Sequence, residues 1–264
     1  MAQTIIFLNQ KGGVAKTTTT INVASQIAKM GHKTLMIDLD PQSSLSIISG
    51  FYDLSIFADT NIKELLQPTD PKNKVDINDC IFPVNCCDNL FLIPSDISLA
   101  TSEMSLFLNL KGEETLKRII KTVPSDFEYI CVDCPPSFGM LSINAIIASD
   151  LIIGCTEPAY MSMRALKHMF DSIENISKIY ERDFGEIGIV VGKIGRGNDT
   201  EDALEYLRTH YNVIGEIKNL VATSKGEIEG IPISIAKPSS LNAREFYKIA
   251  EQIVVKFDEK GQVS

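Results

Sequence analysis

A glycine-rich loop near the N-terminus carries the residue types that hold a chain of phosphates. Residues 9–18 read NQKGGVAKTT, between a short apolar run at 4–8 and a helical pattern at 17–30. Small residues let backbone N–H groups turn inward, and the N-terminus of the next helix adds partial positive charge. We predict that Lys16 reaches the β- and γ-phosphates of a nucleotide and that the Thr17 hydroxyl binds Mg²⁺.

Acidic residues stand at the ends of two later apolar runs. Asp38 and Asp40 follow the run at 34–37, and Asp133 ends the run at 129–132. Because Asp38 and Asp40 are two residues apart, they share a side of an extended chain and could face one Mg²⁺–phosphate centre. Parallel sheets bind ligands at the carboxyl ends of their strands. We therefore expect Asp133 to hold Mg²⁺ through water, as the acid of a Walker B strand does.

Apolar runs alternate with helical patterns along the whole chain. The apolar runs cover 4–8, 34–37, 90–93, 129–132, 151–155, 187–192 and, more weakly, 213–217. Helical patterns cover 17–30, 98–109, 113–122, 139–148, 161–181, 199–209 and 240–257. This alternation predicts an α/β fold, with a mainly parallel sheet and helices on both faces. No linker or repeat divides the chain, so we expect a single P-loop domain over residues 1–264, with a solvated connection at 68–79.

Composition narrows the class of protein. The chain has 264 residues, a net charge of −9, 44% hydrophobic residues and no early apolar run of the length of a signal peptide. The acidity argues against phosphate-binding charge on every face but permits a local basic patch. Six cysteines without an export signal indicate reduced thiols in the cytoplasm. Cys131 and Cys134 are three residues apart on a strand, which points their thiols to opposite faces and disfavours chelation.

The phosphate loop departs from the pattern GxxxxGK[ST] at Gln10 and Ala15, and it carries an early lysine, Lys11, before two glycines. In this it resembles the deviant Walker A loop of the ParA/MinD superfamily of ATPases, KGGxGK[ST]T, here KGGVAKTT. The strings DLDPQ at 38–42 and VDCPPS at 132–137 resemble the second and third signatures of that superfamily, although Ser43 and Ser44 replace a Gly-Asn pair. The resemblance covers nearly the whole chain and is greatest to the short, Soj-like ParA proteins.

The resemblance implies ATP and Mg²⁺ as cofactors and a role for each signature residue. Asp40 would orient or activate the attacking water, Asp38 would assist at the metal, and Lys11 would reach the phosphates of a second subunit. Asn219 is a candidate contact of the base. The implied catalytic residues are Lys11, Lys16, Asp38 and Asp40, the metal ligands are Thr17, Asp38 and Asp133, and the nucleotide-binding residues are Lys11, Gly12, Gly13, Val14, Ala15, Lys16, Thr17, Thr18 and Asn219.

Ala15 stands where the superfamily has a glycine. If that position needs a positive φ, alanine costs roughly 1–2 kcal/mol. If it needs only room for the phosphate, one methyl group is tolerated. We expect weakened or slowed nucleotide chemistry rather than loss of binding.

The function that the resemblance implies is a Mg-ATP-dependent dimerisation switch with weak ATPase activity in plasmid or chromosome partitioning. The ATP-bound homodimer would bind DNA without sequence specificity, and a ParB-like, DNA-bound partner would stimulate hydrolysis. Because no residues precede the first strand, we expect no N-terminal helix-turn-helix domain.

Residues that would bind DNA are the least defined. Short ParA proteins carry arginines in the loop before a Gly-x-Pro-Ile segment, but residues 218–222 here read KNLVA, leaving only Lys218 and Lys225 near the loop. We expect weak DNA binding, or contacts moved to other basic residues, namely Lys193, Arg196, Arg244 or Lys248.

Other functions fit the sequence less well. A MinD-like membrane switch ends in a basic amphipathic helix, whereas residues 254–264 mix charge signs, so we expect no membrane attachment. An NKxD string at 73–76 lies upstream of the Walker B strand, where a guanine-binding motif does not belong, so ATP is preferred over GTP. A P-loop regulatory ATPase without direct DNA binding stays open.

Overall fold

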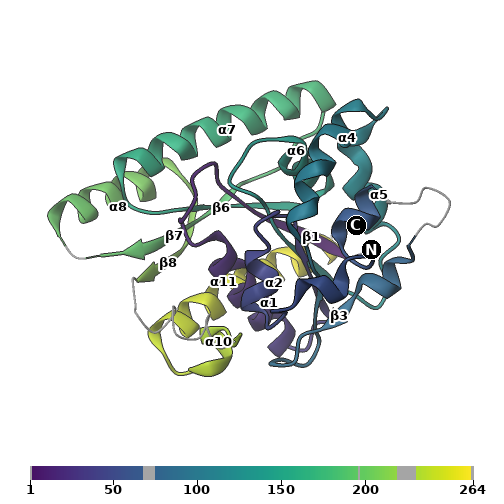
Figure 1. Cartoon of the computed structure of the whole chain (residues 1–264). Helices are drawn as coiled ribbons and strands as arrows, with labels where there is room; N and C mark the ends of the chain where they lie inside the picture. The colour runs from purple at the N-terminus through teal and green to yellow at the C-terminus, as the bar shows by residue number, and fades with distance from the viewer. Residues whose placement is uncertain (1, 68–74, 196, 219–229, 263–264) are drawn as a thin grey trace.

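The strands form one sheet with the loop-bearing strand near its middle (Figure 1). The computed structural model describes residues 2–67, 75–195, 197–218 and 230–262. Across the described sheet the order is β3-β4-β2-β5-β1-β6-β7-β8, and every pair is parallel except β3 with β4. The strands are β1 (Gln3–Leu8), β2 (Thr34–Asp38), β3 (Phe82–Pro83), β4 (Leu90–Ile93), β5 (Tyr129–Asp133), β6 (Leu151–Thr156), β7 (Gly188–Ile194) and β8 (Val213–Lys218).

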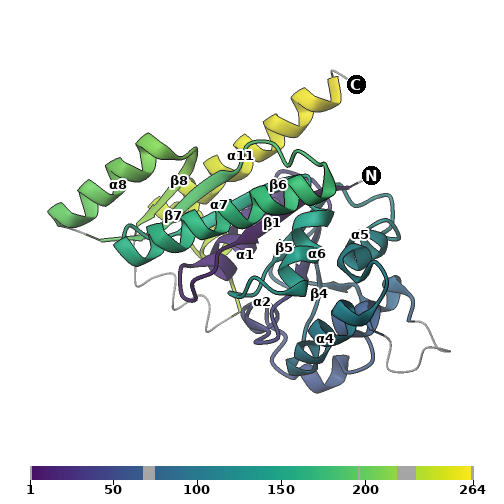
Figure 2. The ribbon, with the colours of Figure 1, turned by 90° about the horizontal axis from the view of Figure 1, so that it is seen from above.

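Helices cover both faces of the sheet, which confirms the predicted fold class (Figures 1 and 2). One face packs against α3 (Ile62–Leu66), α4 (Ser102–Leu108), α5 (Thr115–Ile120), α6 (Met140–Ala148), α7 (Tyr160–Tyr180) and α8 (Asn198–His210). The other packs against α1 (Lys16–Lys29), α2 (Ser44–Ile48), α10 (Ile233–Ala236) and α11 (Leu241–Gln262). Short 3₁₀ turns lie at Leu54–Phe57, Ile77–Cys80, Ile97–Thr101 and Gly112–Glu114.

The long elements were predicted within a few residues, and the short ones were missed. The pattern at 98–109 is divided into a 3₁₀ turn and α4, and the C-terminal helix continues to Gln262. Helices α2, α3 and α10 were not predicted, because four or five residues are too few to show a helical period. Helix α3 is set by a local cap, since the Asn61 side chain accepts hydrogen bonds from the backbone N–H groups of Lys63 and Glu64. Residues 68–74 of the predicted connection lie outside the described part.

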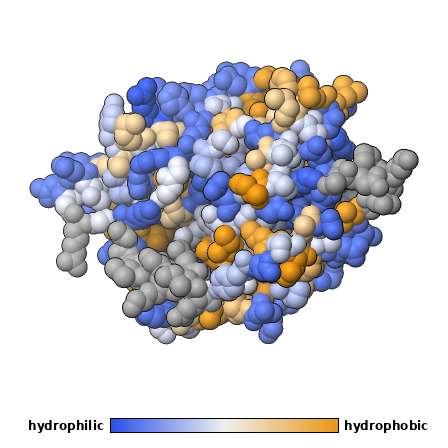
Figure 3. All heavy atoms as spheres, in the orientation of Figure 1, coloured by the Kyte–Doolittle hydropathy of each residue, from blue (hydrophilic) through white to orange (hydrophobic). Residues whose placement is uncertain are grey.

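Some large apolar side chains remain exposed. Met104, Phe107 and Leu108 follow a helical spacing on α4 and are 67%, 71% and 74% exposed. Figure 3 shows apolar residues gathered at the upper right, where Figure 1 places α4. No helix among the described residues is long and apolar enough to cross a bilayer.

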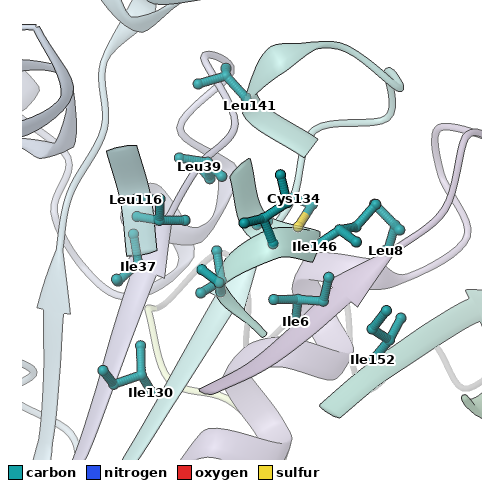
Figure 4. Packing of buried hydrophobic residues seen from close by; sticks show 14 of the residues in the cluster. Ile6, Leu8, Ile37, Leu39, Leu116, Ile130, Cys134, Leu141, Ile146 and Ile152 are labelled. Atoms are coloured by element: carbon teal, nitrogen blue, oxygen red, sulfur yellow. The ribbon is translucent and has the colours of Figure 1, made fainter. Parts of the chain in front are cut away.

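Side chains of the central strands alternate between two buried clusters. Ile6 and Leu8 of β1 join the cluster under α3–α8, whereas Ile5 and Phe7 join the cluster under α1 and α11. Figure 4 shows Ile6, Leu8 and neighbouring residues of the first cluster. Cys131 and Cys134 also fall into opposite clusters, as their spacing predicted, and both thiols are buried. The packing of both faces fixes the carboxyl edge of the sheet, where the phosphate loop leaves β1.

Candidate nucleotide-binding site

The phosphate loop is tied at its start to the neighbouring strand. The side-chain oxygen of Asn9 accepts a hydrogen bond from the backbone N–H of Lys11 (2.8 Å), and its amide nitrogen donates to the carbonyl of Cys155 in β6. Asn9 is fully buried. The loop therefore leaves β1 in a fixed direction, and α1 begins at Lys16, as a phosphate cradle at a helix N-terminus requires.

Ala15 adopts a left-handed backbone conformation, with φ 64° and ψ 28°. Its carbonyl accepts hydrogen bonds from the backbone N–H (2.9 Å) and the hydroxyl (2.7 Å) of Thr19, which start the first turn of α1. Ser43, at the other position where the superfamily signature has glycine, is also left-handed, with φ 55°. The backbone shape that glycine favours is thus kept at both positions, and Ala15 bears a cost of roughly 1–2 kcal/mol.

A cavity of about 510 Å³ opens in front of the loop. The side chain of Lys16 lies at its floor and is only 7% exposed. Val14 is buried in the core and does not line the cavity, so only its backbone could face a nucleotide. The predicted site residues that do line it are Gly12, Gly13, Ala15, Lys16, Thr17, Thr18 and Asp40.

Asp133 lies directly behind the loop. Its carboxylate accepts hydrogen bonds from the hydroxyls of Thr17 (2.7 Å) and Thr20 (3.1 Å). Parallel pairing sets Asp133 opposite Phe7 of β1 on one side and Asp38 of β2 on the other. Burial, together with the negative charge of Asp38, raises the pKa of Asp133 to about 7.

Asp38 is fully buried and does not line the cavity. One of its oxygens accepts hydrogen bonds from the backbone N–H (2.8 Å) and hydroxyl (2.7 Å) of Ser46, and the other accepts from the backbone N–H of Asp40 (3.2 Å). Burial raises its pKa to about 6 against the opposing effect of these hydrogen bonds. Strand β2 ends at Asp38, so the alternation of side chains does not extend to Asp40, which alone of the pair lines the cavity.

The donor set fits a magnesium ion that is bound together with a nucleotide. Mg²⁺ takes one or two protein oxygens and completes its shell with phosphate oxygens and water. The Thr17 hydroxyl lies beside the Asp133 carboxylate, and Asp40 faces the same cavity. Two buried acids with raised pKa values mark a place where a divalent cation would offset negative charge. Within the described ranges, no three His, Cys, Asp or Glu side chains are grouped to hold a metal without a nucleotide.

The ammonium group of Lys11 is bound by two side chains of its own subunit. It forms an ion pair with Glu157, which follows β6, and donates to the hydroxyl of Ser162 in the first turn of α7 (2.9 Å). Ser162 in turn donates to Glu157 (3.0 Å). The sequence analysis missed Glu157 and Ser162. Both residues follow the apolar run at 151–155, which forms β6 and ends at the same edge of the sheet as the phosphate loop. This position could have indicated them from the sequence.

The candidate DNA-binding residues fall in two places. Lys193 and Lys218 line the cavity. Arg244 and Lys248 are exposed on α11 and, with Lys29 of α1, line a separate hollow of about 490 Å³. Three predicted residues, Asn219, Arg196 and Lys225, lie outside the part of the chain that the structure describes.

Comparison with known proteins places this geometry in a family. The AAA domain family matches residues 2–185. An uncharacterized protein of Methanocaldococcus jannaschii is 34% identical over 255 residues, covering 95% of this chain and 97% of that protein. The chromosome-partitioning ATPase Soj of Treponema pallidum is 30% identical over 268 residues, covering 97% of this chain and 98% of Soj.

A solved structure shares the fold. The structure of a plasmid partition protein from Borrelia burgdorferi bound to AMPPNP superimposes with a TM-score of 0.81, at 23% identity, over 97% of this chain and all of that one. Together with the matches in sequence, the loop and its acids lead to one conclusion: the chain belongs to the ParA/MinD superfamily of P-loop ATPases and is Soj-like.

Proposed function

We propose that this chain is a Mg-ATP-dependent dimerisation switch with slow ATP hydrolysis, which partitions plasmid or chromosomal DNA together with a ParB-like partner. The main support is that Lys16, Thr17 and Asp40 line one cavity, while the buried carboxylate of Asp133 accepts a hydrogen bond from the Thr17 hydroxyl behind it (2.7 Å). The relative from Treponema pallidum, whose name states chromosome partitioning, matches over 97% of this chain.

The residues divide the hydrolytic work between them. Lys16 and the inward N–H groups of the loop would bind the β- and γ-phosphates, and Thr17 with Asp133 would hold Mg²⁺. The metal supplies positive charge that stabilises the phosphoryl oxygens in the transition state. Asp40 lines the cavity, and one oxygen of its carboxylate accepts a hydrogen bond from the backbone N–H of Gln42 (2.9 Å). Among the described residues no hydrogen bond reaches the other oxygen, which would orient a water. Asp38 holds Asp40 in place through its backbone N–H.

Dimerisation is supported by the surroundings of Lys11. Tyr160 and Met161, next to its partner Ser162, are 75% and 60% exposed. Exposed aromatic and methionine side chains of this kind are typical of surfaces that bind another protein. In the proposed dimer, a second copy covers this surface, and Lys11 leaves Glu157 to neutralise charge on the phosphates of that copy.

DNA binding is supported by the basic hollow between α1 and α11. Lys29, Arg244 and Lys248 line it, while Glu245 pairs with Lys248 (2.9 Å) and reduces its net charge. One such patch on a chain of charge −9 would bind phosphates weakly. Two patches in one ATP-bound dimer would bind more strongly, which couples DNA binding to the nucleotide state.

Sedimentation velocity tests the proposal. We expect a monomer with ADP, a dimer with ATP and Mg²⁺, and a DNA complex only with ATP and at low salt. A species of the same mass in all three states would refute the switch. An ATP-dependent dimer that does not bind random-sequence DNA would refute only the proposed DNA binding. It would favour a partition ATPase that acts on another cargo.

A further inference from the structure

The end of β7 touches the phosphate loop. A Cβ atom placed on Gly192 would lie 3.4 Å from the Cβ of Ala15 and 3.6 Å from the carbonyl oxygen of Val14. At the same point the pairing of β7 with β8 shifts register between Val191 and Ile194. Irregular pairing of this kind redirects side chains and is frequent beside active sites.

Lys193, between those two residues, has a left-handed backbone with φ 53°. A non-glycine residue there costs roughly 1–2 kcal/mol, so the surrounding structure must impose it. The consequence is a redirected side chain. The Lys193 ammonium nitrogen lies 3.9 Å from the position that a Cβ on Gly13 would occupy, and Lys193 lines the same cavity as Lys16 and Thr17.

The charge of Lys193 is available to a ligand. Within the described part of the chain its ammonium group forms no hydrogen bond or ion pair, and its side chain is exposed. Lys11, by contrast, is paired with Glu157. Burial would raise the pKa of Glu157, but hydrogen bonds from Lys11 and Ser162 and the charges of Lys11 and Lys193 outweigh it and lower that pKa. Glu157 thus stays ionised, and one of the two lysines near it remains without a direct partner.

We propose that Lys193 binds the phosphate chain of the ATP held by its own subunit, as a lysine of the nucleotide site additional to Lys16. The proposal rests on the proposed ATP-binding function. A lysine ammonium is a compact charge on a flexible stem, suited to phosphate oxygens at the open side of a loop. The position over Gly13 assigns it to the phosphates rather than to the base, and it removes Lys193 from the candidate DNA contacts.

Calorimetric titration with ATP, ADP and AMP tests this assignment on Lys193→Met, Lys193→Arg and a control. The control is Lys178→Met, an exposed lysine of α7 that pairs with Glu174 (2.6 Å), far along the helix from the loop. We expect Lys193→Met to weaken ATP binding about tenfold, ADP binding less and AMP binding by under twofold, since each further phosphate adds negative charge. Lys193→Arg should stay within about threefold of the parent, and Lys178→Met should be unchanged.

Equal ATP affinity of the parent and Lys193→Met would overturn the assignment. Loss of ATP-dependent DNA binding in Lys193→Met with unchanged ATP affinity would overturn it in favour of a DNA contact. An equal loss for ATP, ADP and AMP would also overturn it, because it would indicate a distorted loop. If the parent protein binds no ATP while it is folded, the proposed function itself fails, and the parent titration shows this separately.

Discussion

Replacing Ala15 by glycine should stabilise the folded protein, although glycine usually destabilises. The expectation comes from the left-handed backbone at φ 64° and from the position of Ala15 immediately before α1. At this φ the methyl group crowds the following backbone, and glycine removes that conflict.

The magnitude follows from two opposing contributions. Relief of the left-handed strain is worth roughly 1–2 kcal/mol. The greater freedom of glycine in the unfolded chain offsets about 0.4–1 kcal/mol of this. We expect a net gain of about 0.5–1 kcal/mol in the free energy of unfolding. For a chain of this size that corresponds to a rise of about 1–3 °C in Tm.

Denaturant unfolding without nucleotide measures the effect, and Ala203→Gly is the matched control. Ala203 is a partly exposed alanine within α8, where glycine should cost about 1 kcal/mol. Opposite signs for the two variants support the argument. A loss at Ala15 as large as that at Ala203 would show that the position is not strained. An ATP affinity of Ala15→Gly equal to that of the parent would show that Ala15 does not weaken nucleotide binding.

Three further expectations concern the buried residues of the site. Lys16→Ala should abolish detectable ATP binding in calorimetry while the unfolding transition persists; retained affinity would remove Lys16 from the phosphates. Ser46→Ala should lower the free energy of unfolding by about 1.5–3 kcal/mol, because it removes a hydrogen bond to the buried Asp38; Ser172→Ala, at a partly exposed serine of α7, should change it by under about 0.5 kcal/mol. Burial raises the pKa of Asp38 to about 6 and of Asp133 to about 7, so between pH 4 and 7 the folded state holds protons at these sites that the unfolded chain has lost. Their contribution to stability is therefore complete below pH 4 and falls as the pH rises towards 7. Asp133→Asn should flatten this part of the curve of unfolding free energy against pH, measured without nucleotide. An unchanged curve would contradict the raised pKa of Asp133.

The parts of the site that are local in sequence were predictable. The loop at 9–18, the acids at the ends of β2 and β5 and the alternating elements follow from spacing and hydrophobic pattern. Contacts between distant segments were not predictable, because the pairs of Lys11 with Glu157 and of Asp38 with Ser46 depend on packing. The direction of Lys193 depends on a register shift that leaves no signature in the sequence.

The spacing of Asp38 and Asp40 in the sequence did not predict which of the two carboxylates lines the cavity. Their spacing indicates a shared side only while the chain is extended, and β2 ends at Asp38. In the structure Asp40 lines the cavity, whereas the Asp38 carboxylate accepts hydrogen bonds from Ser46. We therefore propose Asp38 as the residue that positions Asp40, in addition to any role at the metal.

Sedimentation and turnover of Asp40→Ala in Mg-ATP test the central claim most directly. A protein that binds ATP but cannot orient the attacking water should accumulate as a dimer of twice 29.1 kDa. Its ATP turnover should fall about 100-fold or more, as expected for loss of a catalytic base. A variant that stays monomeric in saturating ATP, or that hydrolyses ATP at the parental rate, would contradict the account.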